Sequence, residues 1–182
     1  MGAFGTEPTT IDGLTIVRAF TVPEPRGEIR ELFRRSRYEA EIPHEWVPWT
    51  QINLSATKRG AIRGLHAESM TKLVTVAAGR VFAVFVDTRT DSATRGVVHT
   101  RELSPGVQVL VPRGVCNGFQ ALEDSEYLYF FDEEWTPGMP GVSVTPLDPE
   151  LGIIWPIPVD PADRAQVSEK DASAPSLREA LA

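Results

Sequence analysis

The sequence is poor in the residues that usually hold metals or form disulfides. It contains one cysteine, Cys116, and three histidines at positions 44, 66 and 99. A single thiol excludes an intramolecular disulfide and a zinc site with several cysteine ligands, as is typical of proteins in a reducing compartment. Because no two histidines follow a His-X-His or His-X3-His spacing, we expect no metal site built from several histidines.

Positive charge, long apolar runs and phosphate-binding loops are also scarce. Lys and Arg number 18 against 25 Asp and Glu, giving a net charge of -7, which argues against a nucleic-acid-binding surface. No apolar run approaches the roughly 20 residues of a membrane span, and the first ten residues lack the regions of a signal peptide, so we expect a cytoplasmic protein without membrane contact. Glycine loops of the Walker or dinucleotide type and a Gly-X-Ser-X-Gly turn are absent. Proton transfer without a metal or redox cofactor is therefore the natural class of chemistry.

What the chain does contain is a series of short β-rich runs separated by Gly and Pro turns. Its 182 residues, 42% hydrophobic and 24% charged, are enough for one globular domain, which we expect to span 1–182. We expect 1–10 to form an N-terminal tail and 156–182 a C-terminal tail that packs on the body of the domain. The runs that read as strands are 14–17, 50–55, 61–66, 72–76, 81–87, 96–103, 107–111, 115–122 and 126–131. This spacing predicts an all-β antiparallel sandwich or barrel, with little helix apart from 175–182.

The stretch Arg63-Gly64-Leu65-His66 places a guanidinium and an imidazole on one predicted strand. Side chains alternate along a strand, so Arg63 and His66 would face opposite ways unless a bulge at Gly64 turned both toward one cavity. A lone histidine on an apolar strand is more often a core residue than a catalyst. The assignment of His66 therefore depends on the rest of the chain.

Further motifs follow that stretch in a characteristic order. They are Lys72-Leu73-Val74, Gly79-Arg80-Val81-Phe82, Val86-Asp87-Thr88-Arg89, Val111-Pro112-Arg113-Gly114, Asn117-Gly118-Phe119, Glu126-Tyr127-Leu128-Tyr129, Asp148-Pro149 and Gly152-Ile153-Ile154-Trp155-Pro156. Together they resemble the dTDP-4-dehydrorhamnose 3,5-epimerase family, from about residue 22 to residue 175. The resemblance implies a cupin jelly-roll with short peripheral helices, a homodimer, a dTDP-linked 4-keto-6-deoxysugar substrate and no cofactor.

The resemblance also implies catalytic roles. The family removes a proton beside the C4 ketone, forms an enolate and returns a proton on the opposite face. His66 matches the base, Asp171 the carboxylate that orients it, Lys72 the cation at the enolate oxygen and Tyr129 the acid. Taken without the resemblance, Tyr129 reads as a core aromatic, and Lys72 and Asp171 read as solvated charges.

Substrate-binding residues follow in the same way. Arg26 and Glu31 match a segment near the nucleotide, Gln51 and Asn53 match a Gln-X-Asn segment, and Arg63 resembles a pyrophosphate contact, although Glu31 also fits a surface strand. Trp135 falls where the family often has aromatic side chains over the substrate, and it fits a structural tryptophan equally well. The remaining binding residues that we expect are Asn117 and Lys170.

Two features depart from the family pattern. Asn117 stands where the family commonly has a histidine, and an amide cannot titrate. The loop between His66 and Lys72 is shorter than usual and carries Glu68, which either faces solvent or biases the pocket against anionic groups. These departures leave open epimerisation at C3 alone or at both C3 and C5, a different enolate reaction such as 3,4-ketoisomerisation, and a non-catalytic nucleotide-sugar-binding role.

Overall fold

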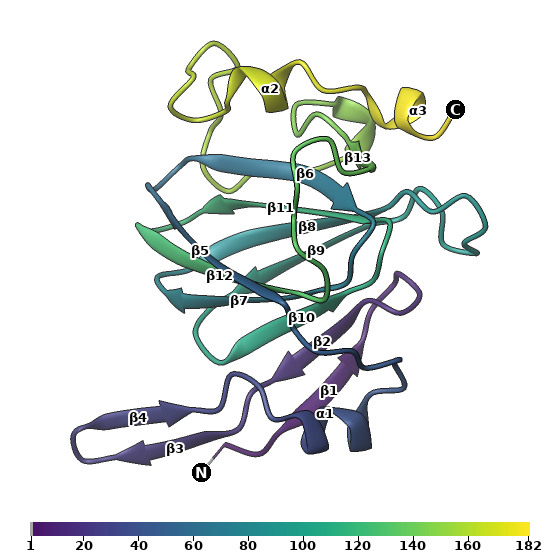
Figure 1. The fold of residues 1–182 in the computed structure, drawn as a ribbon. Coiled ribbons are helices and arrows are strands. Elements are labelled where there is room, and N and C mark those ends of the chain that lie inside the picture. Colours follow the sequence, from purple (N-terminus) through teal and green to yellow (C-terminus); the bar gives the residue numbers. More distant parts are fainter. Residues whose placement is uncertain (1) are drawn as a thin grey trace.

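The computed structural model describes residues 2–182, and most of its regular structure is β-sheet (Figure 1). The strands are β1 (Gly5–Pro8), β2 (Thr15–Arg18), β3 (Thr21–Glu24), β4 (Gly27–Arg30), β5 (Gln51–Thr57), β6 (Ile62–Glu68), β7 (Lys72–Ala78), β8 (Val81–Asp87), β9 (Val98–Leu103), β10 (Val107–Val111), β11 (Val115–Ala121), β12 (Ser125–Phe131) and β13 (Gly141–Ser143). The helices are short: α1 (Arg35–Glu41), the 3-10 turn η1 (Pro149–Leu151), α2 (Glu169–Ala172) and α3 (Leu177–Ala180). None of the described helices has the length and apolar character that a bilayer crossing requires.

The strands form two antiparallel sheets that pack face to face. The six-stranded sheet has the order β1-β2-β10-β7-β12-β5, and the five-stranded sheet has the order β13-β6-β11-β8-β9. Successive strands often lie in different sheets, as β6, β7 and β8 do, so the chain crosses repeatedly between the layers. The predicted all-β sandwich is confirmed.

The core lies between the two sheets. The strand β8 contributes to it and has an almost entirely apolar sequence. Val81, Ala83 and Phe85 point into the central core, whereas Val84 and Val86 point to the outer face of the same sheet. Both faces of β8 are covered, so the usual alternation of polar and apolar residues is replaced by a continuous apolar run.

Each outer face is covered by a segment that carries little regular structure. On the five-stranded sheet, Leu151 and Leu177 pack over residues that include Leu65 and Val84. This C-terminal cover lies along the top of the molecule in Figure 1. On the six-stranded sheet, Tyr38 of α1 is fully buried over residues that include Leu73.

Four elements, in three regions of the chain, differ from the sequence-based expectation. Gly5–Pro8, expected in the N-terminal tail, forms β1 and pairs with β2. β3 and β4 form a separate hairpin that extends away from the sandwich (Figure 1), in a region where the sequence analysis placed no strand. α2 interrupts a segment that had no helical signal. These elements escape detection because each has only four residues, too few to establish a hydrophobic period.

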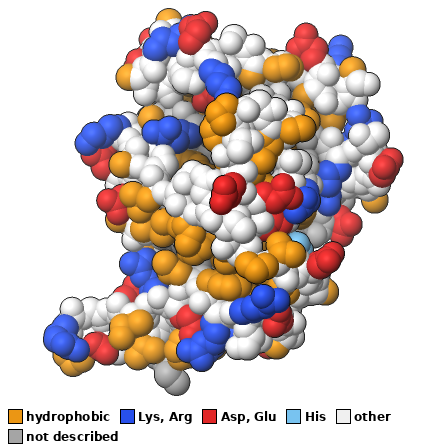
Figure 2. Space-filling view, in the orientation of Figure 1, with side chains coloured by type: hydrophobic (Ala, Val, Ile, Leu, Met, Phe, Trp, Pro, Cys, Tyr) orange, Lys and Arg blue, Asp and Glu red, His pale blue; other side chains and the backbone are white. Residues whose placement is uncertain are grey.

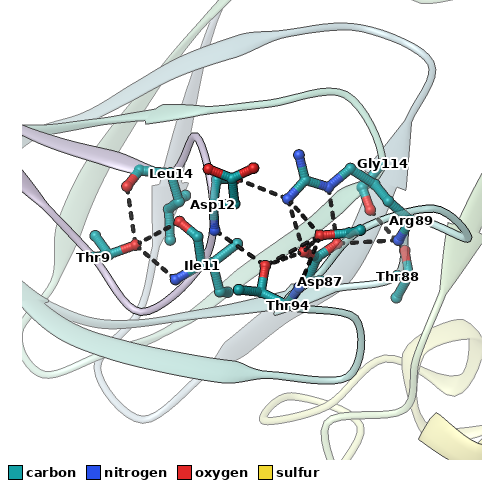
Figure 3. A network of polar contacts seen from close by, with 10 residues as sticks. Thr9, Ile11, Asp12, Leu14, Asp87, Thr88, Arg89, Thr94 and Gly114 are labelled. Atoms are coloured by element: carbon teal, nitrogen blue, oxygen red, sulfur yellow. Dashed lines mark hydrogen bonds and ion pairs between the residues drawn. The ribbon is translucent and has the colours of Figure 1, made fainter.

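A buried carboxylate fixes the start of the chain to the sandwich (Figure 3). Asp87 is fully buried and accepts hydrogen bonds from Arg89, Ser92 and Thr94. Burial raises the pKa of Asp87, but these hydrogen bonds outweigh it and leave the pKa below its ordinary value of 3.8. Arg89 and Thr94 also bond the backbone of Asp12, at 2.8 and 3.1 Å. The cluster therefore stabilises the N-terminal turn and lies outside the cavity described next.

Candidate active site

A cavity of about 1000 Å³ opens between β5 and β12 on one side and β6 and the C-terminal segment on the other. Its size suits a ligand larger than a single sugar. Eight of the residues singled out in the sequence line it: Asn53, Arg63, His66, Lys72, Asn117, Tyr129, Trp135 and Asp171. Among residues 2–182, no group of three His, Cys, Asp or Glu side chains is arranged to hold a metal ion.

An irregularity in β6 lets Arg63 and His66 line the same cavity. Arg63 pairs with Phe119 and His66 with Asn117, so three steps along β6 oppose two steps along β11. Gly64 lies at this shift with a φ of 108°, and a Cβ there would approach the Asn117 carbonyl oxygen to 2.7 Å. A bulge at Gly64, the condition under which both side chains can face one cavity, is thus present, and glycine is required because the two strands touch.

His66 and Asp171 form a dyad at the base of the cavity. His66 Nε2 lies 2.7 Å from Asp171 Oδ1, although the residues are 105 positions apart in the chain. Burial raises the pKa of Asp171, but the hydrogen bond and charge of His66 lower it below the ordinary 3.8, so the carboxylate is ionised at neutral pH. An ionised carboxylate accepts a hydrogen bond from the Nε2–H group, which leaves the lone pair of the neutral imidazole on Nδ1.

The backbone of the C-terminal segment positions Asp171. Ile62 N donates to Gln166 O at 2.7 Å, and Ile62 forms a parallel bridge with Val167. Ser168 then caps α2, its hydroxyl accepting from Asp171 N at 3.1 Å. The first turn of α2 is thereby fixed against the strand that carries His66.

Lys72 is a buried cation held by three oxygen acceptors. It is 3% exposed, and its Nζ donates to Asn117 Oδ1 at 2.9 Å and to His66 O at 3.3 Å. It also forms an ion pair with Glu68, which lines the cavity rather than facing solvent. Glu68 was not among the predicted site residues. The signal that identifies it is the period of a strand, because Glu68 follows His66 by two positions on β6.

The aromatic side chains that line the cavity are Tyr129, Phe131 and Trp135. Tyr129 stacks on Phe131 with centroids 5.7 Å apart, and burial raises its pKa, an effect that the nearby Arg63 guanidinium partly offsets. The phenol therefore keeps its proton at neutral pH. Trp135 is 47% exposed at the rim, where its backbone N–H donates to Gln51 Oε1 at 2.7 Å.

Four predicted binding residues do not line this cavity. Gln51 contacts it indirectly, through its hydrogen bonds to Trp135 and to Asn53. Arg26 lies at the turn of the β3–β4 hairpin with its side chain 88% exposed, and Glu31 pairs with Arg34 and Arg37 beside that hairpin. Lys170 lies on α2 and faces outward.

Comparison with known proteins places the chain among sugar-nucleotide epimerases. The family model described as dTDP-4-dehydrorhamnose 3,5-epimerase matches residues 8–179. A curated dTDP-4-dehydrorhamnose 3,5-epimerase from Streptomyces griseus is 31% identical over 177 residues, covering 94% of this chain and 86% of that protein. A dTDP-4-dehydro-6-deoxyglucose 3-epimerase from a Streptomyces species is 29% identical, covering 93% of this chain and 87% of that protein.

Solved structures give the same result. The epimerase from Legionella pneumophila Philadelphia 1, determined in complex with dTDP-4-keto-L-rhamnose, superposes with a TM-score of 0.86 at 34% identity, covering 97% of this chain and 94% of that one. The 4-keto-6-deoxy sugar epimerase of the novobiocin gene cluster of Streptomyces spheroides superposes with a TM-score of 0.87 at 30% identity, covering 98% and 90%. The chain belongs to the dTDP-4-dehydrorhamnose 3,5-epimerase family.

Proposed function

We propose that the protein is a cofactor-independent epimerase of a dTDP-linked 4-keto-6-deoxyhexose, acting at C3 or at both C3 and C5. The observation that carries this proposal is the His66–Asp171 pair, joined at 2.7 Å in a cavity that also contains the buried cation Lys72. A carbonyl group acidifies the neighbouring C–H bonds, so a base and a positively polarised site for the oxygen are the essential elements.

In the proposed reaction, His66 Nδ1 takes the proton from the carbon beside the C4 ketone. The electron pair of that C–H bond forms the enolate, and its oxygen is directed toward the Lys72 end of the cavity. Asp171 stabilises the imidazolium that results, because it is ionised and bonded to the other ring nitrogen. Tyr129 keeps its proton at neutral pH and returns one to the opposite face of the ring.

The diphosphate is assigned to Arg63. Two groups of its guanidinium are already anchored to β5, with Nε donating to Thr57 Oγ1 at 2.8 Å and Nη2 to Ala56 O at 3.3 Å. The remaining N–H groups can donate to phosphate oxygens. Asn53 and Trp135 line the same cavity, and we assign them as contacts to the part of the substrate that extends out of the cavity.

A homodimer accounts for Arg26 and Glu31, which lie far from the cavity of their own chain. β5 is the last strand of its sheet, and it exposes Ile52 and Leu54 by 58% and 54%. The protruding hairpin exposes Ile29 by 60%. Figure 2 shows hydrophobic side chains gathered both on the face that carries β5 and on the hairpin. In this proposal the hairpin of one copy covers β5 of the other and brings Arg26 to the partner's cavity.

The decisive experiment is incubation with dTDP-4-keto-6-deoxyglucose in deuterated water, reading deuterium at C3 and C5 separately by NMR. We expect incorporation at C3, and its loss in His66→Ala; normal exchange in that variant contradicts the role of His66. Tyr129→Phe should retain exchange and lose net inversion. Formation of a 3-keto product would instead support ketoisomerisation, and binding of dTDP without exchange would support a non-catalytic role.

A further inference from the structure

The ammonium of Lys72 has two hydrogen bonds and an ion pair within the protein before any substrate arrives. A lysine has three N–H donors, and three oxygens surround this one: Asn117 Oδ1, His66 O and Glu68 Oε2. Glu68 Oε2 is itself removed from solvent, so Lys72 is the group that compensates its charge. The cationic end of the cavity is therefore a neutral ion pair, and two of the three Lys72 N–H groups already donate to protein oxygens.

The side-chain amide of Asn117 is oriented by the same contact. Lys72 only donates, so the amide must present Oδ1 to it, which settles which end of the amide is oxygen. The Nδ2 group then lies on the other side. Within residues 2–182, Nδ2 has no hydrogen-bond acceptor. Asn117 lines the cavity and is 4% exposed as a whole, and its Nδ2 atom is not one of the fully buried polar atoms that lack a partner. Nδ2 is thus a fixed neutral donor available to a ligand.

The short loop between β6 and β7 holds Glu68 in place. Glu68 ends β6 and Lys72 begins β7, with residues 69–71 between them. Thr71 N donates to Asp132 Oδ1 at 2.8 Å, so this connection is tied to the end of β12. Glu68 and His66 lie two positions apart on one strand, and both line the cavity. The connection therefore fixes the backbone at Glu68 on the cavity side of the strand.

We propose that Glu68 is a positioning residue that keeps Lys72 in a neutral pair, so that Asn117 Nδ2 donates the hydrogen bond to the substrate's C4 oxygen. This proposal rests on the proposed epimerase function and refines it. The oxygen of an enolate formed here accepts a hydrogen bond from the oriented Asn117 amide, which in turn contacts Lys72, whose charge is compensated by Glu68. The site therefore stabilises the enolate less than an uncompensated ammonium would, and Glu68 sets how readily protons are removed.

The test compares initial rates of deuterium entry at C3 of dTDP-4-keto-6-deoxyglucose. Glu68→Gln keeps the size of the side chain and removes its charge, so exchange should rise about tenfold, the order expected when the Lys72 ammonium is left uncompensated a few ångströms from the enolate in a partly screened site. The rise should disappear when Lys72→Met is also present, because Glu68 acts through Lys72. Glu126→Gln, on the exposed side of β12, is the matched control. An unchanged or slower rate in Glu68→Gln, or the same rise without Lys72, overturns the proposal.

A separate variant tests whether Asn117 donates a hydrogen bond to the substrate. Asn117→Ala should slow exchange at C3 about 100-fold, as the loss of one oriented donor to an oxyanion does in other enzymes. Exchange within threefold of the parent protein would refute that role. Thermal melting of each variant separates loss of a donor from loss of the fold.

A third experiment tests the ion pair of Lys72 in the protein without substrate. The Lys72 ammonium should give a ¹H–¹⁵N signal in the ligand-free protein, because a buried, paired ammonium exchanges slowly with water. That signal should shift or vanish in Glu68→Gln and stay in Glu126→Gln; an unchanged signal overturns the ion pair. If the parent protein exchanges no proton with the sugar nucleotide, the proposed function fails. The NMR signal of Lys72 still decides whether Lys72 and Glu68 form an ion pair.

Discussion

Replacing Asp171 by asparagine tests the proposed dyad most directly. When His66 accepts a proton, its new positive charge lies beside the Asp171 carboxylate, with Nε2 and Oδ1 2.7 Å apart. Two unit charges whose centres are about 4 Å apart attract by about 4 kcal/mol at an effective dielectric constant of about 20. The His66 side chain is 31% exposed, so screening by solvent lowers this to about 3 kcal/mol.

The expected result is a fall of about 100-fold in the rate of deuterium entry at C3, because each 1.4 kcal/mol corresponds to about a factor of ten. Asp171→Asn keeps the size of the side chain, and the cap from Ser168 to the residue 171 backbone remains possible. The matched control is Asp91→Asn, in an exposed loop outside the cavity. A rate for Asp171→Asn within threefold of the parent protein, with an unchanged melting temperature, would refute the dyad.

Three further predictions concern stability and burial. Asp87→Asn should lower the free energy of unfolding by about 3 kcal/mol in urea titrations, because it breaks a buried ion pair. The pKa of Asp87 is lowered in the folded state, so its stabilisation is complete above the ordinary 3.8 and is lost as pH falls below it; the variant should lose less stability in acid than the parent. Gly64→Ala should lower the melting temperature more than Gly138→Ala, since both glycines have positive φ but only the first would contact backbone, 2.7 Å from Asn117 O; equal shifts would contradict the close contact. Burial raises the pKa of Cys116 to about 12, so Ellman's reagent should label it only in the unfolded protein.

Strand positions were predictable from the sequence because most strands have a covered face. The runs predicted at 81–87 and 107–111 coincide with β8 and β10, both of which have a neighbouring strand on each side. The β3–β4 hairpin has no such signal, because it projects from the sandwich and its residues lie at the surface. Local pattern therefore identifies elements that contribute to the core and misses those that do not.

For the site, local pattern indicated the bulge but could not place the partners. Gly64 makes a bulge in this strand possible, and the register shift opposite it, between Asn117 and Phe119, shows one. The proximity of Asp171 to His66 depends on the path of the C-terminal segment, which no periodicity in the sequence encodes. Glu68 lies beyond the bulge and two positions after His66, so the strand period places it on the face that carries His66. A strand that contains a bulge changes face at one residue, so alternation is reliable only on either side of it.

The dyad depends on how the C-terminal segment is attached to the sandwich. His66 is part of a sheet, but Asp171 lies on a helix of four residues, which is too short to be stable alone. Its position is fixed on one side by the bridge between Ile62 and Val167 and on the other by Leu177, which is buried on the outer face of the five-stranded sheet. Leu177 N also donates to Asp148 Oδ2 at 2.6 Å. Packing on the outer face of the sandwich therefore sets the geometry of the proposed base inside the cavity, and changes at Leu177 should affect proton transfer without touching the substrate.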